Sequence, residues 1–121
     1  MINEPTPYTL TAANNYANSL NELKRYQEAR TVLGETVPVA RRVAGETHEL
    51  TLRMRMSYAL ALYSDDDATL NDVREAMDTF EDTARSSRRV LGSAHPTTGW
   101  VEAALRNARA ELHTREAFAR R

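Results

Sequence analysis

The 121-residue chain contains no cysteine, which excludes disulfides, thiolate nucleophiles and zinc sites built from thiolates. It lacks any apolar run near the ~20 residues that span a bilayer, and no charged-then-apolar leader opens it, so neither membrane insertion nor secretion is expected. Neither sign of charge dominates: 16 Lys and Arg face 17 Asp and Glu, and this balance argues against nucleic-acid binding. Gly and Pro are scarce, at four each, while 41% of the residues are apolar. This composition predicts a single folded domain over residues 1–121, with a cytoplasmic location by default.

The chain also contains an internal repeat. The segments that begin at Thr6, His48 and His95 align with one another, and a second pair of segments aligns from Tyr26 and Val73. The alignment gives a first repeat at about 6–45, a second at about 48–92 and a capping half-repeat at about 95–119. A period of about 40 residues with two helical halves is typical of an array of helical hairpins.

Local signals indicate helices throughout. Pro7 and Pro96 stand where a first helical residue belongs, and Gly45 and Gly92 stand just past the second helix of each repeat, where a left-handed residue ends a helix. Pro38 interrupts the second helix and predicts a kink, because proline has no N–H to donate. Five helices are predicted, near 7–23, 26–44, 49–64, 70–91 and 96–118.

Short motifs recur at fixed spacing along the repeats. They are Pro7-Tyr8-Thr9-Leu10, Asn15-Tyr16-Ala17, Tyr26-Gln27-Glu28-Ala29 and Arg89-Val90-Leu91-Gly92, and His95-Pro96-Thr97-Thr98 repeats the first of them. With these motifs, the chain resembles the tetratricopeptide repeats of the kinesin-light-chain type from Thr6 to about Leu112. The resemblance implies an all-α fold: an α-α superhelix, or TPR-type solenoid, of two helical hairpins and a C-terminal capping helix. It also implies a C-terminal fragment of a longer array that binds proteins and is not an enzyme.

The repeat pattern predicts where helices pack. Ala17, Ala29, Ala59 and Ala76 are expected where paired helices approach most closely, whereas Arg106 at the corresponding place of the last helix marks a solvent-facing cap. The first two helices lack a preceding hairpin, so an apolar edge is expected there.

Leu10, Leu33 and Val37 are the residues expected at that edge, and self-association through it is a predicted outcome.

Catalysis and metal binding find little support. His48 and His95 occupy equivalent helix starts and are interpreted as structural, while His113 lies on the capping helix. The loop from Asp65 to Asn71 has the alternate spacing of a calcium site but lacks its glycine and its closing glutamate. No catalytic residue, metal ligand or cofactor is therefore predicted.

The first helices carry the candidate binding residues, since this helix lines the concave face in the family that the chain resembles. With Tyr16, Tyr58 and Leu105 taken as core positions, helical spacing gives the groove. Its predicted residues are Asn14, Asn15, Asn18, Asn21, Arg53, Met56, Leu60, Tyr63, Trp100 and Asn107. An Asn amide both donates and accepts, so several of them can hold a peptide backbone, and Asn15 with Asn18 is the pair expected to do so.

These observations predict an interaction module that binds an extended peptide or a partner protein in the groove. Two alternatives remain open. One is a structural subunit, embedded in a larger assembly through its convex face or N-terminal edge. The other is a regulatory repeat domain of a longer multidomain protein.

Overall fold

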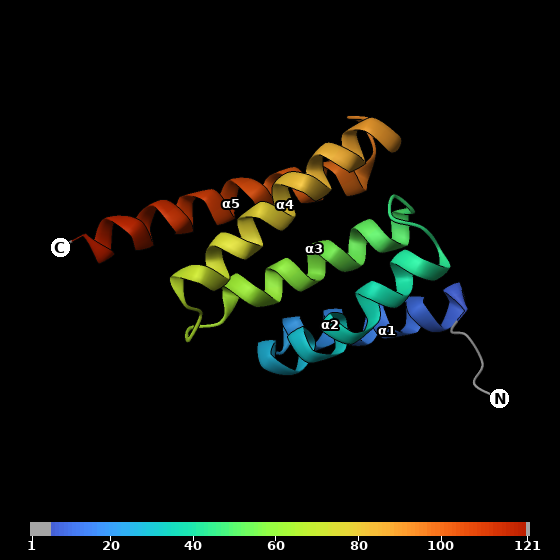
Figure 1. The fold of residues 1–121 in the computed structure, drawn as a ribbon, viewed down its shortest axis with the longest axis horizontal. Coiled ribbons are helices and arrows are strands. Elements are labelled where there is room, and N and C mark those ends of the chain that lie inside the picture. The colour runs from blue at the N-terminus through green and yellow to red at the C-terminus, as the bar shows by residue number, and fades with distance from the viewer. Residues whose placement is uncertain (1–5, 121) are drawn as a thin grey trace.

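The computed structural model describes residues 6–120 and folds them into five α-helices joined by short turns (Figure 1). The helices are α1 (Pro7–Glu22), α2 (Tyr26–Val43), α3 (Glu49–Ser64), α4 (Leu70–Val90) and α5 (Pro96–Ala119). No strand occurs within residues 6–120. The predicted all-α fold is confirmed, and every helix boundary lies within one residue of its predicted position.

Side chains cap the helices where the sequence indicated. The Thr6 hydroxyl accepts the N–H of Thr9 at the start of α1. The Nδ1 atoms of His48 and His95 accept the N–H groups of Leu50 and Thr97, each over 3.1 Å. Both histidines are therefore structural N-caps, since each of them satisfies a helix-end donor that has no partner within the helix.

The turns after α1, α2 and α4 contain a left-handed residue. Gly45 and Gly92 adopt φ values of 112° and 94°, which only glycine reaches without strain. Between α1 and α2 the same role falls to Lys24, with a φ of 60°, which the sequence gave no reason to expect. There the N–H groups of Lys24 and Arg25 donate to the carbonyls of Asn21 and Leu20, so the turn is held by a Schellman pair of hydrogen bonds.

The helices form two layers. α3 packs against all four other helices, α1 pairs with α2, and α4 pairs with α5. The first helices α1, α3 and α5 lie side by side, whereas the backbones of α2 and α4 stay apart and their side chains meet in an ion pair of 3.5 Å between Arg30 and Asp72. α3 therefore forms the centre of the molecule (Figure 1).

Small side chains allow the close approach within each hairpin. Ala17, Ala29, Ala59 and Ala76 are all completely buried, as predicted. At the corresponding place of α5, Arg106 is exposed, so this face of α5 is left to solvent in the part of the chain that the structure describes. The predicted role of α5 as the cap of the array stays a prediction.

The predicted core role of Tyr16 is wrong. Its equivalent in the second repeat, Tyr58, is covered by α2, where a Cβ on Gly34 would lie 3.8 Å from the Tyr58 ring. No described helix covers α1 in the same way, so 55% of Tyr16 is exposed.

The predicted N-terminal edge also needs correction. Leu10, Leu33 and Val37 are buried together in one apolar cluster between α1, α2 and α3, so they do not form an exposed surface. Their burial follows from α3, which packs on the first hairpin and covers them. Pro38 is exposed and does not end α2, which is a single helix to Val43. The predicted kink around Gly34–Pro38 stays a prediction.

A buried arginine joins α3 to α4. The Arg55 side chain is 6% exposed, and its guanidinium donates to Asp82 over 2.6 Å and lies 3.6 Å from the Glu46 carboxylate. The hydrogen bond from Arg55 holds the pKa of Asp82 below its usual range. Because the charged form is favoured in the folded state, Asp82 stabilises the fold above the ordinary carboxyl pKa, and this stabilisation disappears as the pH falls through its lowered pKa.

Replacing Asp82 with Asn should lower the free energy of unfolding at neutral pH by roughly 1 kcal/mol, because Asp82 is half exposed and solvent screens the pair. Urea denaturation over a pH series measures this. The difference between Asp82→Asn and wild type should begin to shrink below about pH 4, where Asp82 of the unfolded chain takes up a proton, and should disappear as the pH falls through the lowered pKa of Asp82 in the folded protein. Asp78→Asn, at an exposed position of the same helix, is the matched control. An Asp82→Asn effect equal to that of Asp78→Asn would contradict the prediction.

Candidate functional site

A hollow lies over the first helices. It has a volume of about 310 Å³ and its lining comes from α1, α3 and α5. The lining residues are Asn14, Asn18, Arg53, Met56, Ser57, Leu60, Trp100 and Ala104. A second hollow, of about 300 Å³, shares Asn18 and Leu60 with the first and extends to the start of α2. Its other residues are Asn21, Glu22, Tyr26 and Ser64. The two hollows together are called the first-helix groove.

Seven of the ten predicted site residues line this groove. They are Asn14, Asn18, Asn21, Arg53, Met56, Leu60 and Trp100. Most of the predicted residues thus gather on one hollowed face of α1, α3 and α5, and their role in binding stays a prediction.

Three predicted residues do not line the groove. Asn15 is exposed and lies outside both hollows, because it is turned about 100° around α1 from Asn14. The Tyr63 ring packs edge-on against Phe80 at 5.8 Å, so it belongs to the contact between α3 and α4. Asn107 is exposed further along α5 than the end of the hollow.

Two asparagines tie α1 to α3. The Ser57 hydroxyl donates to Asn18 Oδ1 over 2.7 Å, and Asn21 Nδ2 donates to the Ser57 carbonyl over 3.2 Å. These bonds fix the spacing of the two helices that form the groove. Asn18 lines the groove and Asn15 does not, and the expected pairing of the two on a ligand backbone stays a prediction.

Two buried amide oxygens of the groove remain without a partner. Neither Asn14 Oδ1 nor Asn21 Oδ1 accepts a hydrogen bond within the described residues, and Asn14 is only 2% exposed. A buried amide oxygen without a donor costs roughly 1 to 3 kcal/mol of stability. Asn14 therefore offers a ligand an acceptor that the folded chain does not use.

Apolar and charged groups flank these amides. Trp100 is 53% exposed at the edge of the groove, near Met56 and Leu60, which are half buried. Arg53 brings a positive charge to this hollow, and Glu22 brings a negative charge to the second one. The groove thus offers an apolar site with an amide acceptor beside it, and opposite charges in its two parts.

The groove also includes residues that the sequence prediction missed. Glu22 and Ala104 lie four residues beyond Asn18 and Trp100, so helical spacing alone could have found them. Tyr26 is different: it begins α2 and reaches the groove only because the α1–α2 turn brings it there.

The described residues show neither a metal-binding group nor a membrane-spanning helix. Within residues 6–120, no group of three His, Asp or Glu side chains is arranged to hold a metal ion. In the acidic loop, Asp65 accepts the N–H of Asp67, and Thr69 with Asp72 forms the capping box of α4. Over the same range, no helix is both long and apolar enough to cross a membrane.

Comparison with known families identifies the repeat. A family model described as Tetratricopeptide repeat matches residues 8–70, and a second model with this description matches residues 67–97. The chain belongs to the tetratricopeptide repeat family, whose repeats are generally protein–protein interaction modules. Searches of curated proteins and of solved structures found no match to the chain.

Replacing Asn14 with Leu should stabilise the protein, because the substitution removes a buried acceptor that has no donor. The increase in the free energy of unfolding should be roughly 1 to 2 kcal/mol above that of Asn15→Leu, measured by urea denaturation. Both variants gain the same helix propensity, and only Asn14 is buried, so the difference between them isolates the burial effect. Equal or lower stability of Asn14→Leu would show that the Asn14 amide is satisfied in solution.

Proposed function

We propose that this protein is an interaction module, with repeats of the kinesin-light-chain type, that binds an extended peptide in the first-helix groove. The observation that carries the proposal is the buried, unpartnered Oδ1 of Asn14 in a hollow that also exposes Trp100. A peptide N–H would supply the missing donor. Binding would then remove the destabilising effect that the unpartnered Asn14 oxygen has in the free protein.

The surrounding residues define the kind of peptide. Met56, Leu60 and Trp100 form an apolar wall for one large side chain of the ligand. Arg53 lines the same hollow and attracts an acidic residue next to that side chain, while Glu22 disfavours one in the second hollow. The proposed ligand is therefore an extended segment with an apolar residue and a neighbouring acidic residue. The proposal includes no enzymatic activity and no cofactor, and it locates the binding in the cytoplasm.

Trp100 is the only tryptophan of the chain, so its fluorescence reports on this groove. Linear peptides selected from a phage-displayed library should shift Trp100 emission to the blue on binding, because the ligand displaces water from the indole. Asn14→Leu should weaken the selected peptides about tenfold, the loss expected for one hydrogen bond to a desolvated peptide group. Fluorescence titration of wild type and variant measures both effects.

Tyr16→Ala is the control for this titration, because Tyr16 is exposed on α1 but lies outside the groove. It should bind the peptides as wild type does. Selected peptides that bind without changing Trp100 emission, and equally well to Asn14→Leu, would contradict the proposed groove.

A second candidate function is assembly through the N-terminal edge, and the exposure of Tyr16 favours it. A hollow of about 330 Å³ surrounds this ring, and its other residues are Gln27, Glu28, Thr31 and Val32. Tyr16, Glu28 and Val32 align with Tyr58, Glu75 and Thr79 of the second repeat, where α2 covers the tyrosine. In the second repeat, α2 occupies the position beside Tyr58. The equivalent position beside Tyr16 is open to a partner.

Self-association through this edge should make the sedimentation coefficient rise with protein concentration. Tyr16→Glu should reduce that rise, because it replaces an apolar ring with a negative charge near Glu28. Asn107→Glu adds the same charge at an exposed position of α5, remote from this edge, and should not. A wild-type monomer at all concentrations would exclude assembly of this kind.

A further inference from the structure

The first and second helices of the two hairpins end differently. The second helices carry arginines in their last turns, which are Arg41 and Arg42 in α2 and Arg88 and Arg89 in α4. Positive charge at this place stabilises a helix, because the C-terminal end of the helix dipole is negative. The last turns of the first helices α1 and α3 contain no basic residue. These two helix ends therefore have no compensating cation of their own.

The ends of α1 and α3 meet in the second hollow of the first-helix groove. Glu22 is the last residue of α1 and Ser64 is the last residue of α3, and both line this hollow of about 300 Å³. The last carbonyl groups of a helix have no partner within the helix. The second hollow thus combines the partial negative charge of two helix ends with the carboxylate of Glu22.

The side chains around the second hollow are also predominantly negative. No cation of the described chain lines it. Two neighbouring arginines are already paired with carboxylates over 2.7 Å: Arg25 with Glu28, and Arg115 with Glu111. The remaining charges in and beside the hollow, within residues 6–120, are Lys24, Glu22, Asp65, Asp66 and Asp67. Negative charge therefore exceeds positive charge there by three.

Arg53 does not offset this excess. It lines the first hollow and precedes Ser64 by 11 residues on α3, which is about 16 Å along the helix axis. Salt at physiological concentration screens exposed charges beyond about 8 Å. The first-helix groove is therefore positive at one end and negative at the other.

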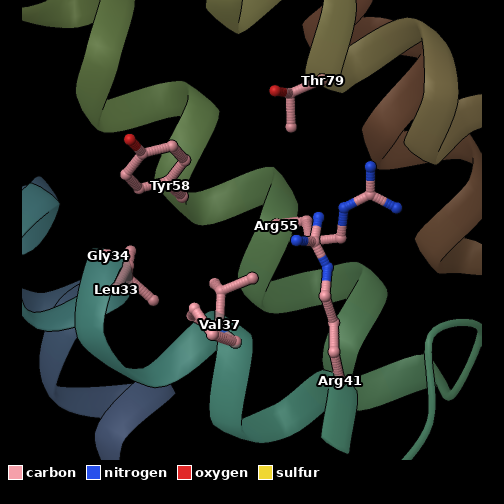
Figure 2. Close-up of a pocket in the computed structure, with 8 residues that line it drawn as sticks. Leu33, Gly34, Val37, Arg41, Arg55, Tyr58 and Thr79 are labelled. Atoms are coloured by element: carbon pink, nitrogen blue, oxygen red, sulfur yellow. The ribbon is translucent and has the colours of Figure 1, made fainter.

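The opposite side of α3 differs, because its charges are used by the fold. A hollow of about 200 Å³ lies there between α2 and α4, and Figure 2 shows Arg41 and Arg55 among its walls. Arg41 lies 3.2 Å from the Glu46 carboxylate, and Arg55 donates to Asp82 over 2.6 Å. Glu22 of the second hollow has no such ion pair within the described residues.

A buried acceptor of the second hollow also lacks a donor. Asn21 lines the hollow and is 7% exposed, and its Oδ1 accepts no hydrogen bond within residues 6–120. Its Nδ2 donates to the Ser57 carbonyl over 3.2 Å, which holds the amide in place. A carboxamide oxygen only accepts, so a ligand has to bring a donor, and an ammonium or guanidinium group brings several.

We propose that the second hollow binds a lysine or arginine side chain of the partner peptide. The inference rests on the proposed peptide site and adds a basic residue to its ligand. The charged group lies between the Glu22 carboxylate, Asn21 Oδ1 and the end of α3. The methylene stem of the ligand residue packs on Tyr26 and Leu60, which are half buried in the same hollow.

The position of the basic residue follows from the two adjoining hollows. They share Asn18 and Leu60, so one extended chain passes through both. Alternate side chains of an extended chain point to the same side. The basic residue therefore stands two positions from the apolar residue that contacts Met56 and Trp100 in the first hollow.

The probes are acetyl-Leu-Gly-Lys-amide and acetyl-Lys-Gly-Leu-amide, one for each chain direction. In ¹⁵N-labelled protein, at least one of them should give saturable amide shifts at Glu22 and Ser64, together with a blue shift of Trp100 emission. Replacing its lysine with norleucine removes the charge but keeps the stem. The affinity should then fall about fivefold at low salt, and this difference should shrink in 1 M salt.

The two readouts separate this inference from the proposed function. Equal affinity of the lysine and norleucine peptides, or no shift at Glu22 and Ser64, would overturn the cation site. Trp100 emission that still responds in that case would support the peptide groove alone. Shifts at Glu22 and Ser64 without a change in Trp100 emission would support the cation site and contradict the apolar wall of the groove.

Glu22→Lys tests the assigned residue. It should remove the preference for lysine over norleucine, while the urea midpoint of unfolding rises, because the new cation compensates the end of α1. The same peptide with glutamate in place of lysine should bind Glu22→Lys more tightly than it binds wild type. A retained preference for lysine would overturn the assignment of Glu22.

Glu35→Lys is the matched control, because Glu35 is exposed on α2 and lines neither hollow of the groove. It makes the same change of charge nine residues beyond Tyr26, and it should bind the lysine peptide as wild type does. A loss in Glu35→Lys equal to that in Glu22→Lys would show that only net charge matters and would overturn the cation site.

Discussion

The close approach of paired helices is the constraint on which the rest of this structure depends. Four alanines without exposed surface stand where the helices of the two hairpins meet, and any larger side chain there would separate them. The separation would act on every other contact, because α3 packs on all four remaining helices. Helix spacing set by small residues thus controls the width of the hollows on both sides of α3.

Polar groups inside this packing have separate roles. Asn18 and Asn21 are used by the fold, because both bond to Ser57 and hold α1 against α3. Asn14 is buried and its Oδ1 finds no donor, which lowers the stability of the fold. The Oδ1 of Asn21 also lacks a donor, although the Nδ2 of the same amide donates to Ser57. Arg55 shows the same contrast within one side chain, since its end nitrogens face Asp82 and Glu46 while its Nε–H is left over.

The two faces of α3 give the molecule two chemically different surfaces. The first-helix side carries neutral amides, apolar side chains and one arginine, which suits a peptide backbone with its side chains. The side of α3 that faces α2 and α4 has a smaller hollow, in which Arg41 and Arg55 pair with Glu46 and Asp82 beside an apolar space. Because the faces share no lining residue, a partner on one side does not compete sterically with a partner on the other.

The sequence by itself determined the helices and their ends. Caps such as Thr6 and His95, and left-handed glycines such as Gly45, act through neighbours a few residues away, so the local pattern contains all the information they need. The face of each first helix was predictable for the same reason, since helical spacing is a local property. Within residues 6–120, Lys24 departs from these local rules, because it takes a left-handed turn without being glycine.

The tertiary structure alone decided the environment of each side chain. Tyr16 and Tyr58 stand in equivalent motifs, yet one is exposed and the other is covered, because only Tyr58 has a preceding hairpin packed on it. Asn14 and Asn15 are adjacent in the sequence, and the exact rotation of α1 against α3 buries the first and exposes the second. Burial and hydrogen bonding across helices depend on contacts between residues far apart in the chain, and a local pattern does not specify these contacts.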